Sequence, residues 1–304
     1  MGNPSRKEFL GMSAAALSGL LIDSSFLSKK KSLPLAFSTL GCPDWNFSQV
    51  MDFAVANNYT GIELRGIQRQ MDLTQCPEFI TAQKRSETLA LMKQKGLQFV
   101  NLGSSANLHI AEAAERKKNL DEARNFIELA KNINCPYVRV FPNKFPNAGD
   151  KKTTIELIAK GLKELGDYAR EKNVKVLMET HGDAVHIEDI LSIMQASAHD
   201  HVGLVWDVCN MWTVTKESPK DAYAKLGKYI YHTHIKDAKL ENNQPHYILL
   251  GKGEVPIFEA IDVLRKNGYK GYYSFEWEKL WHPEIAEPDI ALADYPVAMK
   301  NHFK

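Results

Sequence analysis

Hydrophobic and polar residues follow two alternating patterns along the chain from residue 33 onward. Short runs rich in β-branched and aromatic residues predict strands at 35–40, 61–64, 98–102, 137–141, 175–179, 202–207, 230–235 and 272–276. Between them, apolar residues recur at helical spacing and predict helices at 47–57, 80–95, 111–132, 153–172, 187–197, 220–226, 256–267 and 288–300. The predicted order is therefore strand, helix, strand, helix throughout.

Several of the predicted strands carry apolar residues at successive positions, as at 202–206. Such runs are typical of parallel strands that are buried on both faces. No Gly-x-Gly-x-x-Gly motif follows the first strand, which argues against an open dinucleotide-binding sheet. Eight strand–helix units favour a single (β/α)8 TIM barrel, and the lack of a linker-like segment favours one domain over residues 33–304.

The first 30 residues have a different pattern and predict an export signal. A polar, basic opening that includes Arg6 and Lys7 precedes an apolar run at 12–22, which is too short to cross a bilayer. The opening resembles the bacterial twin-arginine export motif, with Lys7 in place of its second arginine. A buried amphipathic helix is the alternative, but polar residues at helical spacing are missing from the run. We therefore expect an exported protein, periplasmic in a bacterium.

The charge of the chain bears on which partners it can bind, and its cysteine content bears on whether it needs a disulfide. The chain has 38 Lys+Arg and 37 Asp+Glu, a formal net charge of +1, so no basic surplus points to nucleic acid or to an anionic membrane. The cysteines are widely spaced, and Cys42, Cys135 and Cys209 lie in or beside predicted strands. A buried free thiol is the common fate of such residues, so we expect no required disulfide.

Ionisable side chains mark the carboxyl ends of four consecutive predicted strands. Glu179, Asp207, His234 and Glu276 lie at or close to the ends of the fifth to eighth strands, and TIM barrels build their active sites at this end. Three carboxylates converging on one opening repel one another unless a cation lies between them. Carboxylate oxygens with a single imidazole favour Mn²⁺, with Mg²⁺, Co²⁺ or Zn²⁺ as alternatives. The sequence therefore predicts one divalent metal ion held by these four side chains.

This ordered set resembles the metal site of the xylose isomerase-like TIM-barrel superfamily, the sugar phosphate isomerase/epimerase family. That group includes ketose 3-epimerases, inosose dehydratases and hydroxypyruvate isomerases. The likeness extends over residues 34–280 and includes Gly-Cys-Pro-Asp-Trp at 41–45, Gly-Ile-Glu at 61–63 and Leu-Gly-Lys-Gly-Glu at 250–254. It implies an enzyme whose metal binds a sugar carbonyl and the neighbouring hydroxyl, and stabilises the enediolate formed when the intervening proton leaves.

The resemblance also implies roles for individual residues. Glu179 and Glu276 would be both metal ligands and the acid/base pair that removes and returns the proton. Asp207 and His234 would be ligands only. Because a metal-bound carboxylate is a weak base, His181 is a further candidate for taking the proton, with a hydrogen bond at the rim as its alternative role.

Polar and aromatic residues near the other strand ends are candidates for holding the substrate. Arg139 and Lys236 could polarise hydroxyl groups or the enolate oxygen. The candidates for hydrogen bonds to a polyol are Glu63, Asn101, His246 and Glu254. Three tryptophans near strand ends could stack on a sugar or pack in the rim: Trp45, Trp212 and Trp277.

The sequence departs from the family pattern at two sets of positions, and these departures bear on the subfamily to which it could belong. Ketose 3-epimerases have a histidine three residues after the sixth-strand aspartate, where this chain has Asn210. The three-zinc endonuclease branch needs that histidine and others on the first four strands, and this sequence lacks them. The sequence therefore argues against a nuclease, in agreement with its balanced charge.

The sequence thus favours a metal-dependent sugar isomerase or epimerase with a small sugar as its partner. The same enolate could instead expel a β-substituent, so a lyase or dehydratase acting on a keto-sugar or a 3-keto-glycoside is the alternative. A non-catalytic sugar-binding barrel is a third interpretation, but the complete set of ligands speaks against it. Which sugar, which metal and whether the chain forms a homo-oligomer stay open.

Overall fold

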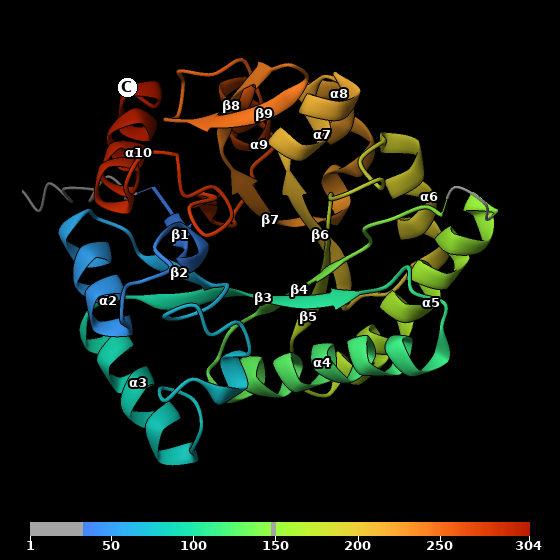
Figure 1. Ribbon diagram of the computed structural model, residues 1–304, viewed down its shortest axis with the longest axis horizontal. Helices are drawn as coiled ribbons and strands as arrows, with labels where there is room; N and C mark the ends of the chain where they lie inside the picture. The colour runs from blue at the N-terminus through green and yellow to red at the C-terminus, as the bar shows by residue number, and fades with distance from the viewer. Residues whose placement is uncertain (1–32, 147–149) are drawn as a thin grey trace, which may run out of the picture. The chain divides into compact units, whose positions relative to one another are not determined.

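Eight parallel strands close into a barrel in the computed structural model, which describes residues 33–146 and 150–304 (Figure 1). The predicted export signal at 1–30 lies outside these residues. The order round the barrel is β1-β10-β7-β6-β5-β4-β3-β2. The bounds are β1 (Leu35–Ser38), β2 (Gly61–Leu64), β3 (Gln98–Asn107), β4 (Tyr137–Phe141), β5 (Lys175–Glu179), β6 (Val202–Asp207), β7 (Ile230–Ile235) and β10 (Tyr273–Phe275). The predicted (β/α)8 TIM barrel is confirmed.

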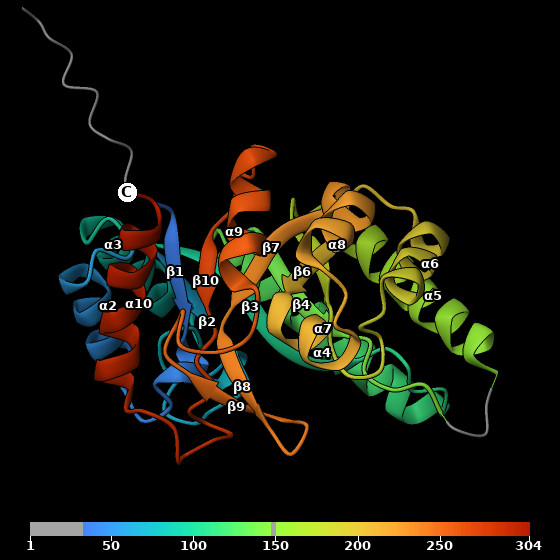
Figure 2. The same ribbon diagram turned by 90° about the horizontal axis from the view of Figure 1, so that it is seen from above.

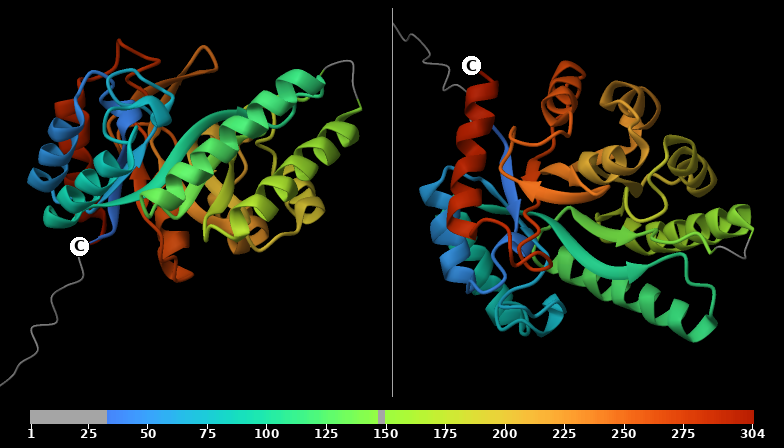
Figure 3. Two further views of the ribbon diagram at one scale, coloured as in Figure 1. Left: turned by 90° about the horizontal axis from the view of Figure 1, so that it is seen from below. Right: turned by 45° about the horizontal axis from the view of Figure 1, so that its top comes forward.

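Helices follow the strands and surround the barrel (Figure 3). Local capping sets where they begin: Asn46 and Gln49 form a capping box at the start of the first of them, and Thr81 caps the next. No helix of the described chain is long and apolar enough to cross a membrane. The bounds are α2 (Phe47–Ala56), α3 (Ala82–Gln94), α4 (Ala113–Asn132), α5 (Lys151–Arg170), α6 (Ile187–Ser197), α7 (Val208–Thr215), α8 (Pro219–Leu226), α9 (Ile257–Lys266) and α10 (Pro288–His302).

Two barrel segments differ from the predicted pattern. β3 continues to Asn107, beyond its predicted end at 102, while β1 ends at Ser38 and a short 3-10 turn follows. The helix α7 was not predicted. It begins directly after β6 because the Asp207 carboxylate accepts a hydrogen bond from the backbone N–H of Asn210 at 2.8 Å.

The interior of the barrel carries polar side chains on alternate residues of its strands. His232 and His234 on β7 both contact Glu63 of β2 across the barrel, and Lys236, two residues further, contacts Glu276. Since side chains on a strand alternate between two faces, a shift of two residues moves a side chain one layer along the barrel. The strands thus stack ionisable groups from the barrel's middle to its carboxyl end.

A two-stranded hairpin, which was not predicted, leaves the carboxyl end of β7 (Figure 2). It consists of β8 (Asp237–Glu241) and β9 (Gln244–Ile248). The carboxylate of Asp237 accepts hydrogen bonds from the backbone N–H groups of Gly251 at 2.8 Å and Gly253 at 2.9 Å. The Leu-Gly-Lys-Gly-Glu motif is therefore a loop folded round one buried carboxylate.

We expect Gly253→Ala to destabilise the protein. A Cβ at this position would lie 2.1 Å from Asp237 Oδ1 and 2.5 Å from the carbonyl oxygen of Ala238, so the loop must move off its carboxylate. A loss of about 1–3 kcal/mol in the free energy of unfolding is expected, measured by chemical denaturation. The matched control is Lys252→Ala, because Lys252 is exposed. Equal stability of the two variants would contradict this role for Gly253.

The cysteines are buried free thiols, as expected for Cys42, Cys135 and Cys209. Burial raises the pKa of Cys135 to about 12, so this thiol stays protonated and unreactive at neutral pH.

Candidate metal centre and active site

Four ionisable side chains meet at the carboxyl end of the barrel. Glu179, Asp207 and His234 come from β5, β6 and β7, and Glu276 directly follows β10. One potential ligand atom from each lies within 4.8 Å of the corresponding atom of every other. All four side chains are buried, with at most 3% of any residue exposed. The structure therefore brings together the four residues that were predicted as metal ligands.

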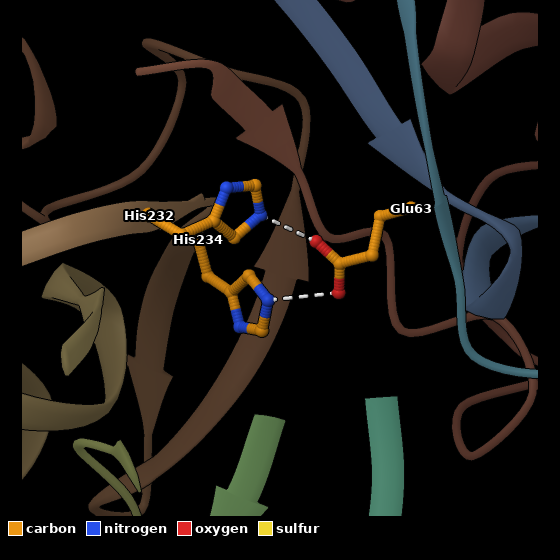
Figure 4. A group of neighbouring side chains, drawn as sticks. All are labelled: Glu63, His232 and His234. Atoms are coloured by element: carbon orange, nitrogen blue, oxygen red, sulfur yellow. Dashed lines mark hydrogen bonds and ion pairs between the residues drawn. The ribbon is translucent and has the colours of Figure 1, made fainter. Parts of the chain in front are cut away.

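His234 lies at the centre of this cluster and uses its two ring nitrogens differently. Nδ1 lies 3.2 Å from Glu179 Oε1, 3.2 Å from Glu276 Oε2 and 3.8 Å from Asp207 Oδ2. Nε2 donates a hydrogen bond to Glu63 Oε1 at 3.0 Å (Figure 4). A carboxylate that accepts from one ring nitrogen fixes the tautomer and turns the other nitrogen towards a metal.

Glu63 lies inside the barrel and contacts the cluster through His234. Its Oε2 accepts hydrogen bonds from His232 Nε2 at 2.7 Å and from the Ser274 hydroxyl at 3.0 Å, and the residue is fully buried (Figure 4). Both carboxylate oxygens of Glu63 thus accept hydrogen bonds inside the barrel, so Glu63 orients His234. Its contact with a polyol stays a prediction.

Two buried cations hold the outer oxygens of the carboxylates. Arg139 Nε lies 3.1 Å from Glu179 Oε2. Lys236 Nζ lies 2.8 Å from Asp207 Oδ2, 2.6 Å from Glu276 Oε2 and 2.5 Å from Glu278 Oε1. Burial acts to raise the pKa of Glu179 and of Glu276, but His234, followed by Arg139 and Lys236 respectively, holds each below its usual value.

The electrostatics of the cluster fit a divalent cation. Burial raises the pKa of Asp207 to about 7, and Glu276 and Glu179 add to the shift, although Lys236 opposes it. Burial acts to lower the pKa of His234, but the surrounding carboxylates raise it well above its usual value. Glu179 Oε2 and Asp207 Oδ2 are ion-paired with Arg139 and Lys236, although neither oxygen accepts a hydrogen bond from a described residue. A divalent cation among the three carboxylates would reduce their mutual repulsion and displace the proton from His234.

His181 lies beside the cluster with one nitrogen free to accept a proton. Asn143 donates a hydrogen bond from Nδ2 to Asn107, so its Oδ1 faces His181 and accepts from Nδ1 at 2.8 Å. The ring packs against Phe141, with 4.6 Å between the ring centres. Burial lowers the pKa of His181. The imidazole is therefore neutral at pH 7, and Nε2 carries a lone pair.

If His181 takes the proton, His181→Gln should lower kcat by about 10²- to 10⁴-fold while metal affinity is kept. Because the pKa of His181 is lowered, activity should rise with pH through a value below 6.5 and stay high above it. The control is His186→Gln, since His186 is exposed. A rate and pH profile unchanged in His181→Gln would assign the base role to another group.

The other predicted contacts lie in different parts of the barrel, Asn101 beside Glu63 in register and the other two in the segments that follow β7. Asn101 on β3 is fully buried, and neither its amide oxygen nor its nitrogen bonds to a described residue. His246 lies on β9, and Glu254 accepts a hydrogen bond from the backbone N–H of Leu240 at 3.3 Å. Neither of these last two belongs to the four-residue cluster. Glu254 thus stabilises the β8–β9 hairpin.

The three tryptophans differ in their surroundings. Trp277 is fully buried and donates its Nε1–H to the carbonyl of Ala286. The ring stacks on Phe275, with 5.6 Å between the ring centres, which favours the packing role over stacking on a sugar. Trp45 and Trp212 are half-buried, and Lys216 Nζ lies 3.6 Å from the ring centre of Trp212.

Sequence reasoning missed three residues at the site: Arg65, Asn143 and Glu278. Arg65 and Glu278 each lie two positions after a residue that was considered, Glu63 and Glu276. The period of two that places side chains on one face of a strand would have found both. No comparable signal marks Asn143, which follows β4 in a loop.

Comparisons with known proteins agree with this fold. Residues 51–294 match the family model described as xylose isomerase-like TIM barrel. The chain is 23% identical over 226 residues to 3-dehydroshikimate dehydratase of Bacillus anthracis, and this alignment covers 71% of this chain and 78% of that protein. It is 24% identical over 179 residues to fructoselysine 3-epimerase of Shigella flexneri, and this alignment covers 57% of this chain and 64% of that protein.

Solved structures show the same fold. The IOLI protein with a bound zinc atom aligns with a TM-score of 0.74 at 17% identity, over 89% of this chain and 98% of that one. The match to the family model and this alignment confirm the resemblance drawn from the sequence. The two curated relatives are enzymes, which confirms the prediction that the chain is an enzyme.

Proposed function

The chain belongs to the xylose isomerase-like TIM barrel family, and we propose that it is a divalent-metal-dependent sugar isomerase or epimerase. In this proposal it removes a proton from the carbon beside a substrate carbonyl group. The observation that carries the proposal is the convergence of three carboxylates and one imidazole on a buried point, with His234 Nδ1 turned towards the carboxylates.

The residues of the site would have distinct roles. Glu179, Asp207, His234 and Glu276 would hold the ion, which would supply Lewis-acid chemistry to a carbonyl oxygen when bound. Mn²⁺ is the ion we propose, given the oxygen-rich donor set.

Glu179 and Glu276 come from β5 and β10, which are separated by β6 and β7 in the barrel. They therefore reach the substrate position from two sides, as a base and an acid on opposite faces of one carbon must. Arg139 and Lys236 keep the two carboxylates ionised and fix their outer oxygens. His181 would accept the proton where a ligated carboxylate is too weak a base.

A lyase or dehydratase is the second candidate function. Proton removal beside a carbonyl is common to both reactions, which differ only in whether a proton returns or a β-substituent leaves. The support for it is the relative from Bacillus anthracis, whose name is that of a dehydratase.

The test is incubation of the Mn²⁺-loaded full chain with keto-sugars, aldo-sugars and 3-keto-glucosides in deuterated water. We expect deuterium to enter one substrate at one carbon, and EDTA to remove this exchange until Mn²⁺ is restored. An epimer as product supports the first candidate function, and an eliminated group supports the second. Exchange at full rate in chelator would contradict the metal-dependent mechanism.

We also propose that residues 1–30 direct export to the bacterial periplasm. Phosphorylated sugars are largely cytoplasmic, so an exported enzyme would act on free or glycosidic sugars. Fractionation of the native host tests this directly. A cytoplasmic protein that still carries residues 1–30 would contradict it.

A further inference from the structure

Arg65 is a buried cation at the carboxyl end of β2 with no carboxylate partner. Only 6% of the residue is exposed. Its Nη2 donates to the Ser105 hydroxyl at 3.0 Å and its Nη1 to the carbonyl of Gly103 at 3.4 Å. Both acceptors are neutral, and within 33–146 and 150–304 no Asp or Glu oxygen lies within 4.0 Å of the Arg65 guanidinium. Arg139 and Lys236, the other buried cations of the site, each contact at least one carboxylate.

The backbone of β3 is shaped to admit Arg65 beside Arg139. A Cβ on Gly103 would lie 2.6 Å from Arg65 Cδ and 2.9 Å from Arg139 Nη2. Any larger residue would therefore displace one of the two guanidinium groups. Burial, followed by the like charge of Arg139, lowers the pKa of Arg65 to about 9, while Glu276 and Glu179 act in the opposite direction. Arg65 thus shares the opening of the barrel with the four-residue cluster.

A buried charge without a counter-ion is costly, and like charges nearby increase the cost. Proteins accept such a cost mainly where a ligand supplies the missing charge. Two of the five N–H groups of Arg65 are used by neutral oxygens, which leaves donors for a planar anion. The fork of a guanidinium matches a carboxylate, which can accept two parallel hydrogen bonds.

We propose that Arg65, beside Arg139, forms a subsite for a carboxylate group of the substrate, so that the enzyme takes acidic sugars in preference to neutral ones. This rests on the proposed function for the reaction itself. Arg65 is a specificity-determining residue in this proposal, because it contacts the carboxylate and not the carbon that loses its proton.

The test uses two pairs of ketoses that differ only at C6, D-fructose with D-fructuronate and D-tagatose with D-tagaturonate. Calorimetry on the Mn²⁺-loaded full chain gives a dissociation constant for each. We expect the acid of at least one pair to bind roughly 10- to 100-fold more tightly than its neutral partner, as for a hydrogen bond between charged groups. In Arg65→Gln this ratio should fall to about one, because the acid loses the charged group that it binds. The control, Arg69→Gln, removes an exposed arginine paired with Asp44 and should keep the wild-type ratio.

A second measurement separates binding from a structural role. Without sugar, Arg65→Met should be as stable as the wild type or more stable, because it removes an unpaired buried charge, and Arg65→Lys should retain part of the preference for acids. Equal binding of both members of each pair by the wild type would overturn the proposal. So would an unchanged ratio in Arg65→Gln, or a lowered melting temperature in Arg65→Met. Loss of deuterium exchange for every sugar, with the binding ratio intact, would instead reject the proposed reaction and leave the subsite standing.

Discussion

Glu276→Gln and Glu179→Gln are each expected to lower the rate of deuterium exchange by at least about 10³-fold. Each substitution keeps the size of the side chain but removes a metal ligand and one member of the acid/base pair. It also removes a carboxylate from a buried cation, one of the three around Lys236 in the first variant and the one beside Arg139 in the second. The measurement is exchange of substrate hydrogen with deuterated water at saturating Mn²⁺.

Glu284→Gln is the matched control, because Glu284 lies exposed in the loop after β10 and, among the described residues, forms an ion pair only with His282. It should exchange at the wild-type rate. Circular dichroism must show that the two test variants are folded. Exchange above a tenth of the wild-type rate in either folded variant would remove that glutamate from the mechanism.

Lys236→Met is expected to destabilise the metal-free protein by about 3–5 kcal/mol. Lys236 is 1% exposed and lies within 2.8 Å of oxygens of three carboxylates, those of Asp207, Glu276 and Glu278. Removing one partner of a buried ion pair leaves uncompensated charge, which costs more than the pair itself contributes. Chemical denaturation in the presence of EDTA measures the loss.

Mn²⁺ should restore more stability to Lys236→Met than to the wild type, because the ion supplies the positive charge that the variant lacks. The control is Lys239→Met, in which an exposed lysine of the neighbouring hairpin is changed in the same way. A metal-free Lys236→Met as stable as this control would show that the carboxylates do not depend on Lys236.

The barrel could be predicted because its strands are unusually clear in the sequence. β4, β5, β6 and β7 have the predicted bounds, and β5 and β6 are apolar runs that end in Glu179 and Asp207. The hairpin β8–β9 could not be predicted in this way. Its strands are short and polar, and their pairing depends on the Asp237 carboxylate, which folds the loop that follows.

The metal cluster could be predicted because the carboxyl ends of neighbouring parallel strands lie at one edge. How deep each side chain lies within the barrel was harder to predict, as two residues at the end of β2 show. Glu63 and Arg65 have the same orientation, yet Glu63 lies a layer below the opening and contacts His232, while Arg65 reaches the level of Arg139. The spacing of two residues predicts one layer between them, but not which layer each occupies, since that depends on the stagger between neighbouring strands.

The most direct test of the central claim is anomalous diffraction from a crystal of the full chain soaked with Mn²⁺. We expect one strong peak per chain within bonding distance of Glu179, Asp207, Glu276 and the Nδ1 atom of His234. Glu63 should still accept the hydrogen bond from His234 Nε2. A manganese peak elsewhere with none at this point, or four side chains that turn away from one another, would contradict the account.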